Sequence, residues 1–374
     1  MKILFDDQIF LLQKFGGISR YFTELIYELN QSKDHQAICP IVQTKNIHYN
    51  EKIDKGLSLM ERLKRISSFK FSEKGISRYA ARQNRKNVIK ALKEKDFDLF
   101  VPTYYDPYFL PYLDDKPFVL NVYDMIHEIY PTYFTADDLA LNHKKGLIEK
   151  ATKIIAISES TKRDILKIYP NTPAEKIEVV HLAGGIDDQS TLDLELPKSY
   201  ILFVGNRAHY KNFNFFFKSI APILKENPSL YLVCAGGNEF TPEELLLIKQ
   251  QGVANQVMQR NFKDAELASY YLNAKCFVFP SVYEGFGIPV LEAMSCGCPI
   301  VLANHSSFPE VAGDAGIYFE LEDEADLRAK VSTLVFNEDL RAEFKQKGLV
   351  QCKKFGWGKT AKECISIFNS IQKS

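Results

Sequence analysis

Hydrophobic residues gather in short runs rich in β-branched and aromatic side chains, and longer segments with helical spacing separate these runs. A short apolar run is typical of a strand that is buried on both faces. Strands that alternate with helices predict α/β domains whose parallel sheets are joined by crossover helices. The expected strands are residues 3–5, 37–42, 98–101, 118–122, 154–157, 177–180, 200–204, 230–235, 276–279, 299–302 and 316–319.

The alternation stops near the middle of the chain. Residues 187–198 are polar, contain Pro197 and show no periodicity, which is typical of an interdomain linker. A chain of 374 residues is also too long for one typical domain. We therefore expect one domain over residues 1–190 and another over 198–354. We expect the last helix, about 357–374, to pack back on the first domain.

Composition narrows the choice of partners. The chain has 47 basic and 47 acidic residues, so no overall positive field favours nucleic acid. Its seven cysteines form no CxxC pair, which predicts reduced thiols rather than a zinc site. The first residues, MKILFDD, resemble a strand rather than a signal peptide, and no apolar stretch reaches the roughly 20 residues that span a bilayer. These features predict a cytoplasmic protein and leave contact with a membrane surface open.

Positive charge is concentrated in residues 62–93, which hold eleven Lys or Arg and one acid, a balance of 11 − 1 = +10. Apolar residues are interleaved with these charges, and helical spacing would give a basic amphipathic surface. Two interpretations stay open. One is a solvated helix with a loop, and the other is a peripheral binding surface for an anionic membrane.

The most informative motif covers residues 277–294, where a strand leads through a glycine-containing turn into a helix. Gly285 and Gly287 let the backbone approach a ligand closely, and a helix N-terminus attracts anions, so this turn suits a diphosphate. Glu284 and Glu292 flank the turn, and a carboxylate accepts hydrogen bonds from the hydroxyls of a sugar or ribose.

A second motif, residues 203–212, follows the first strand of the second domain. Arg207 and Lys211 come after a glycine turn and precede a helix. Two fixed cations at this point suit the binding of both phosphates and would stabilise the charge on a departing diphosphate. His209 lies between them and receives no role.

Glu284 and Glu292 form an E-x7-E pattern, which continues in residues 293–301 and 309–316. This pattern resembles the retaining GT-B glycosyltransferases of family 4 (glycosyl transferases group 1), of the bacterial surface-polysaccharide type. The resemblance implies two Rossmann-like, doubly wound domains that face each other across a cleft. It implies that Glu284 contacts the donor sugar, that the amides of Gly285, Phe286 and Gly287 contact the phosphates, and that Glu292 contacts the ribose.

The same resemblance implies transfer of a hexosyl unit from a nucleotide diphosphate sugar, GDP-mannose or a UDP-hexose, to a glycan or lipid-linked glycan. Because basic groups and amides would stabilise the departing diphosphate, no cofactor and no metal are expected. Two alternatives stay open: another GT-B enzyme, such as a nucleotide-sugar 2-epimerase, or an inactive nucleotide-sugar-binding subunit. A phosphorylase is disfavoured because such enzymes are normally much longer.

In the first domain, two segments resemble cleft loops of the family. Gly17 lies in a double-glycine loop that precedes a helix, and its expected place is near the donor phosphate and the acceptor. Residues 121–128 follow a strand, and many relatives have a histidine where this chain has Tyr123. Asp124 and His127 are the candidates for part of the role of that histidine in orienting the sugar or the acceptor.

Overall fold

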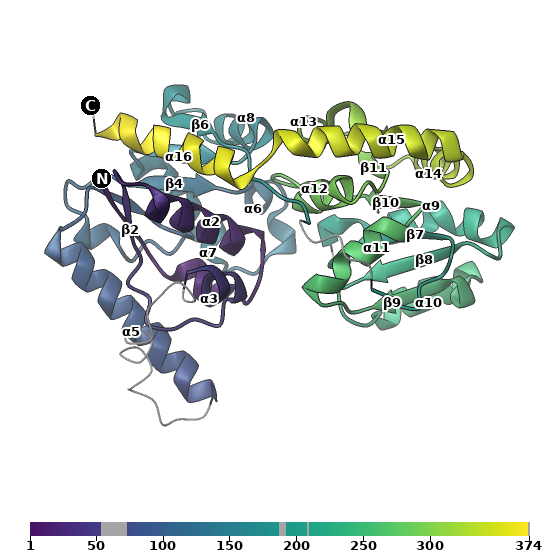
Figure 1. The fold of residues 1–374 in the computed structure, drawn as a ribbon, viewed down its shortest axis with the longest axis horizontal. Helices are drawn as coiled ribbons and strands as arrows, with labels where there is room; N and C mark the ends of the chain where they lie inside the picture. The colour runs from purple at the N-terminus through teal and green to yellow at the C-terminus, as the bar shows by residue number, and fades with distance from the viewer. Residues whose placement is uncertain (54–72, 187–191, 208, 373–374) are drawn as a thin grey trace. The chain divides into compact units, whose positions relative to one another are not determined.

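The computed structural model describes residues 1–53, 73–186, 192–207 and 209–372, and the chain forms two compact units (Figure 1). Unit 1 contains Met1–Leu182 and Trp357–Ser374, and unit 2 contains Ala183–Gly356. The division falls between residues 182 and 183, a few residues before the predicted end of the first domain.

Unit 1 holds two short parallel sheets that an isolated parallel bridge between Phe100 and Phe118 connects. Their strand orders are β2-β1-β3 and β4-β5-β6. The strands are β1 (Lys2–Phe5), β2 (Gln36–Ile38), β3 (Leu99–Val101), β4 (Val119–Val122), β5 (Lys153–Ala156) and β6 (Ile177–Val179). The helices are α1 (Gln8–Leu12), α2 (Gly17–Gln31), α3 (Ile47–Lys52), α5 (Glu73–Glu94), α6 (Ile126–Ile129), α7 (Leu139–Lys150), α8 (Glu159–Ile168) and α16 (Trp357–Ile371).

Local chemistry accounts for several boundaries in unit 1. Strand β2 ends at Ile38 rather than at residue 42, because Pro40 has no backbone N–H to continue the ladder. Helix α8 begins after Ser158, whose side chain accepts a hydrogen bond from the amide of Thr161. Serine is preferred at this position, because its side-chain oxygen satisfies an amide that has no partner within the helix.

The last helix, α16, contacts α2 within unit 1, and both helices can be followed in Figure 1. The hydroxyl of Tyr21 on α2 lies 3.3 Å from the sulfur of Cys364 on α16, and both side chains are buried. The guanidinium of Arg20 lies 5.6 Å from the ring centre of Trp357, at the start of α16. The end of the chain is thus part of the core of unit 1.

Unit 2 has one parallel sheet of six strands in the order β9-β8-β7-β10-β11-β12. The strands are β7 (Tyr200–Val204), β8 (Tyr231–Ala235), β9 (Val257–Arg260), β10 (Cys276–Phe279), β11 (Ile300–Ala303) and β12 (Gly316–Phe319). The helices are α9 (Phe213–Glu226), α10 (Pro242–Gln251), α11 (Leu267–Asn273), α12 (Ile288–Ser295), α13 (Phe308–Ala312), α14 (Glu324–Phe336) and α15 (Glu338–Gln351).

This strand order places a topological switch point between β7 and β10, because the chain runs outward from β7 on one side and from β10 on the other. Every residue of β7 and β10 is buried, as expected for central strands of a sheet covered on both faces. In doubly wound folds, ligands bind beyond the carboxyl ends of the strands at such a point. The loops after β7 and β10 are therefore the first place to examine for a site.

Each predicted strand has a counterpart in the structure, and the predicted α/β fold of two doubly wound units is confirmed. Strand β9 was missed, because its sequence, VMQR, is half polar and its residues are only partly buried at the sheet edge.

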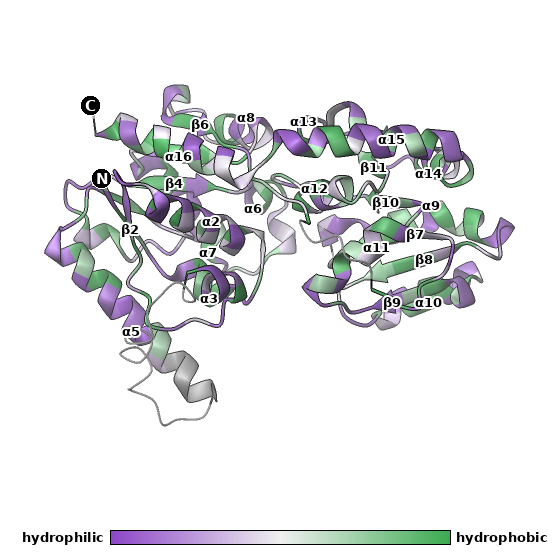
Figure 2. Ribbon diagram, viewed as in Figure 1, coloured by the Kyte–Doolittle hydropathy of each residue, from purple (hydrophilic) through white to green (hydrophobic). Residues whose placement is uncertain are grey.

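Figure 2 shows hydrophobic colour along β7 and β8 and hydrophilic colour over much of α5. The seven cysteines are free thiols, as predicted. Within the described ranges, no helix is long and apolar enough to cross a membrane.

Candidate active site

The loops after β7 and β10 in unit 2 bring one cation and one carboxylate together. Lys211 ends a short 3-10 turn, His209–Lys211, before α9, and Glu284 lies between β10 and α12. The ammonium Nζ of Lys211 is 2.5 Å from Oε1 of Glu284, and the two side chains are 17% and 15% exposed. Two residues 73 positions apart in sequence thus form a half-buried ion pair at the switch point.

The surroundings of Lys211 keep it positively charged. Its Nζ lies 4.9 Å from the ring centres of Tyr210 and Phe279, so two aromatic faces flank the cation. Burial alone would lower the pKa of Lys211, but the carboxylate of Glu284 and the side chain of Tyr210 together outweigh burial and raise this pKa above its usual value. The ammonium is therefore a fixed positive charge at neutral pH.

Serines that follow β11 hold the loop that carries Glu284. The amide of Glu284 donates to Oγ of Ser306 at 3.2 Å, and its carbonyl accepts from Oγ of Ser307 at 2.9 Å. Ser307 also donates to the carbonyl of Phe286 at 3.0 Å. Both serines were missed in the sequence, where Ser-Ser in a polar segment carries no distinctive signal.

Helix α12 begins at the predicted glycine turn. Gly287 is its N-cap with φ +95°, and a Cβ at this position would lie 3.3 Å from the ring of Phe308, so both conformation and space favour glycine. Phe286 is buried and packs edge-on against Phe355, with ring centres 5.8 Å apart. Glu292 lies further along the helix, and its Oε2 accepts a hydrogen bond from the hydroxyl of Tyr271 at 3.4 Å.

Arg207 differs from Lys211, although both were expected to contact phosphate. The Arg207 side chain is 3% exposed, and its Nε donates to Oε1 of Glu244 at 2.9 Å. The rest of the guanidinium donates to four carbonyls of the loop after β8, those of Gly236, Gly237, Asn238 and Glu239. These contacts make Arg207 the organiser of this loop, and its contact with a phosphate stays a prediction.

Gly237 makes this arrangement possible. A Cβ at Gly237 would lie 2.5 Å from the carbonyl oxygen of Gly205 and 2.8 Å from Nη1 of Arg207. Its φ of +73° also favours glycine. Glu244 accepts the Arg207 hydrogen bonds and also forms a capping box with Thr241 at the start of α10. The double glycine after β8 was the signal in the sequence that could have located this loop.

In unit 1, Asp124 and His127 lie close together after β4, at the start of α6. Nδ1 of His127 is 3.6 Å from Oδ1 of Asp124, and Nε2 is 3.4 Å from Oδ1 of Asp138. The His127 side chain is 10% exposed and packs on Phe134, with ring centres 4.0 Å apart. The imidazole is therefore enclosed by two carboxylates and an aromatic ring.

Lys144 on α7 supports this cluster and was missed by the sequence interpretation. Its side chain is fully buried, and Nζ donates to Oε2 of Glu128 at 2.9 Å and to the carbonyl of Asp124 at 3.0 Å. Burial alone would raise the pKa of Asp124, but Lys144, His127 and the amide of Ile126 together outweigh burial and hold this pKa below its usual value. Asp124 is therefore an ionised carboxylate.

The other predicted positions of unit 1 have structural roles that are clear. Tyr123 is buried, and its hydroxyl donates to the carbonyl of Thr103 at 3.2 Å, which fixes it in the core. Gly17 is the first residue of α2. Oε1 of Gln13 accepts from the amide of Ser19 at 3.2 Å, in the first turn of this helix. Among the described residues, no group of three or more His, Cys, Asp or Glu side chains is arranged to hold a metal ion.

Comparison with known proteins gives two family matches, one for each part of the chain. Residues 15–189 match the family described as Glycosyltransferase Family 4, and residues 187–350 match the family described as Glycosyl transferases group 1. The chain is 26% identical to the O-antigen chain mannosyltransferase B of Escherichia coli, over 99% of this chain and 100% of that protein. It is 29% identical to the serotype-specific mannosyltransferase WbdA of Escherichia coli, but over 62% of this chain and 30% of that protein.

Solved structures show the same fold at low sequence identity. The Anabaena protein HepE, crystallised with UDP and glucose, aligns with a TM-score of 0.70 and 15% identity, over 99% of this chain and 100% of HepE. The sucrose-phosphate synthase of Thermosynechococcus elongatus aligns with a TM-score of 0.70 and 14% identity, over 100% of this chain and 99% of that one.

Proposed function

We propose that this chain, which belongs to the GT-B glycosyltransferases of family 4 (glycosyl transferases group 1), is a hexosyltransferase. It transfers a hexosyl unit from a nucleotide diphosphate sugar to a glycan or lipid-linked glycan, and it retains the anomeric configuration. The observation that carries the proposal is the ion pair of Lys211 and Glu284 at the switch point of unit 2. It supplies a fixed cation for a diphosphate and a carboxylate for sugar hydroxyls at one place.

On the donor side, Lys211 would bind the diphosphate and neutralise the negative charge that grows as the bond to the sugar breaks. The amides of Gly285, Phe286 and Gly287, at the N-terminus of α12, would contact the phosphates. Glu284 would orient the sugar through its hydroxyls, and Glu292 would accept from the ribose. Arg207 would act through the loop that it organises rather than by direct contact.

On the acceptor side, the proposal assigns roles to three residues of unit 1. Asp124 and His127 would orient the acceptor or the transferred sugar, because they form an ordered and partly exposed cluster. Gly17 would allow close approach of the backbone at the start of α2. Retention would follow if the acceptor hydroxyl attacks the face of the sugar from which the diphosphate leaves. The departing phosphate would take the hydroxyl proton, and the transition state would resemble an oxocarbenium ion.

The names of the relatives favour a mannosyl donor, since two matched proteins are named mannosyltransferases. A thermal-shift screen of GDP, UDP, dTDP and ADP would identify the nucleotide, because a ligand that binds the folded state raises its apparent stability. Mass spectrometry and NMR of the product made from GDP-mannose, or from the UDP-hexoses, would then give the sugar and its anomeric configuration. An inverted product, or no donor consumption with any of these nucleotide sugars, would contradict the proposal.

Metal-independent turnover is part of the same proposal. It is supported by the charge of Lys211, which can neutralise a departing diphosphate without a cation from solution. Donor consumption in excess EDTA should be nearly unchanged. A loss of turnover that manganese restores would contradict this part and leave the glycosyltransferase assignment intact.

A dock on anionic membranes through residues 62–93 also remains a proposal. Residues 62–72 lie outside the described residues, and side chains are described from residue 79 onward in α5. On that helix Ala80, Asn84, Val88 and Leu92 are buried, while Arg82, Lys86 and Lys90 are exposed at four-residue spacing and form a basic stripe. A basic residue near an anionic surface adds roughly 1 kcal/mol of attraction.

Flotation with liposomes tests this dock. Binding should grow with the fraction of anionic lipid, fall with salt, and weaken when Arg82, Lys86 and Lys90 are replaced together by Gln. Replacing Lys145, Lys150 and Lys167 by Gln is the control of equal charge change in the same unit. Absence of binding to anionic liposomes at low salt would favour a soluble acceptor.

A further inference from the structure

We propose that a pocket within unit 1 binds one neutral sugar ring of the acceptor, and that its two aspartates select against anionic sugars. This inference rests on the proposed function and specifies the class of acceptor. The pocket has a volume of about 350 Å³ and is lined by Ile9, Leu12, Gln13, Ile18, Tyr104, Thr135, Asp137, Asp138 and Leu139. That volume lies at the lower end of the range of small-molecule sites, about 300–1,000 Å³.

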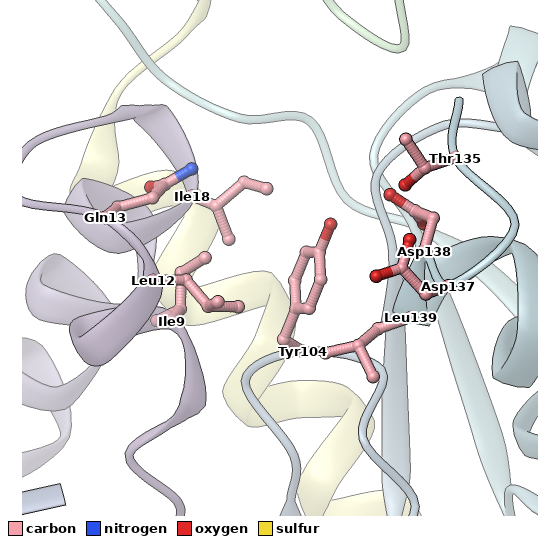
Figure 3. A pocket seen from close by; sticks show the side chains of 9 residues that line it. All are labelled: Ile9, Leu12, Gln13, Ile18, Tyr104, Thr135, Asp137, Asp138 and Leu139. Carbon is pink, nitrogen blue, oxygen red and sulfur yellow. The ribbon is translucent and has the colours of Figure 1, made fainter. Parts of the chain in front are cut away.

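The pocket has an apolar side and a polar side, and Figure 3 shows the ring of Tyr104 between them. Ile9, Leu12 and Ile18 come from α1 and the start of α2. Thr135, Asp137 and Asp138 come from the segment that leads into α7. A pyranose has C–H groups on its faces and hydroxyls around its rim, so a ring that lies against Tyr104 would direct its rim toward the aspartates and Gln13.

The ionisation states of the residues that line the pocket allow them to form hydrogen bonds with the hydroxyls of a sugar. The side-chain hydrogen bond with Thr135 lowers the pKa of Asp137, so this exposed carboxylate is an acceptor at neutral pH. Burial, together with the charges of Asp124 and Asp138, raises the pKa of Tyr104, so its hydroxyl stays protonated and able to donate. The lining thus offers acceptors for several hydroxyls and a donor for a ring or linkage oxygen.

Among the residues that the structure describes, two carboxylates and no basic side chain line this pocket. A phosphate, a uronic acid or a sialic acid would place like charges beside Asp137 and Asp138, which disfavours binding. A sugar without charge meets no such penalty. The same argument disfavours the diphosphate of the donor here, so the chemistry of the lining separates this pocket from the site around Lys211.

Asp138 connects the pocket with the proposed catalytic cluster. Its Oδ1 accepts from the amides of Ala140 and Leu141, at 2.8 and 3.1 Å, as the N-cap of α7. The same oxygen is 3.4 Å from Nε2 of His127. A sugar held by this wall would therefore lie next to the imidazole, which is where an acceptor hydroxyl would be oriented for transfer.

Direct binding of simple glycosides to the full-length chain tests the pocket without any need for turnover. The probes are the methyl glycosides of mannose, glucose, galactose and N-acetylglucosamine, with methyl glucuronide as the anionic counterpart, measured by saturation-transfer NMR titration. At least one neutral glycoside should bind saturably, and methyl glucuronide should bind at least about 5-fold more weakly than methyl glucoside. Saturable binding of none of the neutral glycosides would overturn the proposal.

Variants locate the bound sugar. Tyr104→Ala and Asp137→Asn should each weaken binding about 5-fold or more, as expected when a ring contact or a hydrogen bond to a charged group is lost. Tyr104→Phe keeps the ring and should weaken binding less than Tyr104→Ala. The control Asp115→Asn removes an exposed aspartate of the same unit away from the pocket and should have no effect.

A free sugar could also bind at the donor site around Glu284. The variant Glu284→Gln therefore distinguishes binding at that site from binding in the pocket. Binding that Glu284→Gln abolishes and Tyr104→Ala leaves intact would overturn the pocket assignment. The affinity for the nucleoside diphosphate, measured by calorimetry, should stay unchanged in Tyr104→Ala and Asp137→Asn. If Tyr104→Ala and Asp137→Asn lose glycoside binding but keep nucleoside diphosphate binding, the pocket assignment is supported. An unmodified chain that binds no nucleoside diphosphate would contradict the proposed function instead.

Discussion

The two units have the same kind of parallel sheet, but the carboxyl ends of their central strands carry opposite chemistry. In unit 2 the loops after β7 and β10 present Lys211, Glu284 and the start of α12. In unit 1 the residues after β1 are Asp6 and Asp7, and Thr103 follows β3. Since both units are built from parallel strands, the difference arises from the loops, which under the proposed function suit one unit to a diphosphate and the other to hydroxyl groups.

The acids of unit 1 are held in two different ways. Oδ1 of Asp6 accepts from the amide of Thr103 at 2.8 Å and from its hydroxyl at 2.5 Å. Both carboxylate oxygens of Asp7 are buried and have no hydrogen-bond partner among the described residues. Burial first, and the charge of Asp6 second, raise the pKa of Asp7 to about 7, against an opposing effect of Arg85. Unit 1 therefore holds a carboxyl that is partly neutral near physiological pH.

The largest effect should come from replacing Arg207. This variant tests whether Arg207 supports the structure of unit 2, in contrast to Lys211, which is proposed to bind the ligand. Arg207→Ala removes the partner of the buried Glu244 carboxylate, and it removes one donor from each of four carbonyls in the partly exposed loop after β8. Loss of one partner of a buried ion pair costs about 3–5 kcal/mol, so thermal unfolding of unit 2 should start at a much lower temperature. Arg260→Ala, at an exposed position of the same unit, is the control. Unchanged thermal unfolding of Arg207→Ala would show that this loop does not depend on Arg207.

Lys211→Ala should weaken binding of the nucleoside diphosphate and should lower stability less than Arg207→Ala, because the Lys211–Glu284 pair is more exposed than the Arg207–Glu244 pair. A charged hydrogen bond of this kind contributes on the order of 2–4 kcal/mol, or roughly 30- to 1,000-fold in affinity, which isothermal calorimetry can measure. Lys218→Ala removes an exposed lysine of α9 and should leave affinity unchanged. If Lys211→Ala bound the diphosphate as tightly as the unmodified chain, the anion site of unit 2 would have to lie elsewhere.

Glu284→Gln tests whether the carboxylate beside Lys211 acts on the sugar. Because its proposed partner is the sugar rather than the phosphates, turnover should fall by roughly 10- to 100-fold while affinity for the nucleoside diphosphate is kept. Steady-state kinetics and calorimetry on the same preparation separate the two quantities. Glu226→Gln is the control at an exposed position. A parallel fall in turnover and diphosphate affinity would instead assign Glu284 to the positioning of Lys211.

In unit 1, Lys144→Met should change the pH dependence of turnover. Without the ammonium, the pKa of Asp124 should rise because burial is then opposed by fewer favourable contacts, so the acidic limb of the pH–rate profile should move to higher pH. A depressed pKa also stabilises the fold above the usual aspartate pKa, and this contribution is lost as the pH falls through the folded pKa. Lys145→Met, an exposed neighbour on α7, should leave the profile in place. An unmoved acidic limb in Lys144→Met would exclude Asp124 as the group that limits turnover at low pH.

The smallest effect should come from Asp7→Asn. The folded chain keeps a proton on Asp7 that the unfolded chain releases near pH 3.8, so the stability due to the neutral carboxyl is complete below pH 3.8 and is lost as the pH rises toward about 7. Asp7→Asn should therefore raise the unfolding temperature at pH 8 more than at pH 5, by roughly 2–4 °C for each kcal/mol. The exposed control Asp115→Asn should show no such difference. A larger gain at pH 5 than at pH 8 would contradict the raised pKa.

Much of the fold could be predicted because its signals are local. The apolar runs of β7 and β10, the cap at Ser158, and the glycine turn before α12 each depend on residues within a few positions of one another. Strand β9 was missed for the same reason, since an edge strand with a polar sequence has no local signature. The E-x7-E pattern also located Glu284, because the turn and the helix that carry it are continuous in sequence.

The sequence by itself therefore determined the α/β class, the places of the strands and the residue types at the turns. Only the tertiary structure decided which charges meet. It directed Arg207 into the loop after β8, paired Lys211 with Glu284, and buried Lys144 under Asp124. It also gathered the lining of the pocket around Tyr104 from segments up to 130 positions apart. The physical reason is that backbone conformation follows neighbouring residues, whereas the partner and the burial of a long charged side chain depend on elements that only packing brings together.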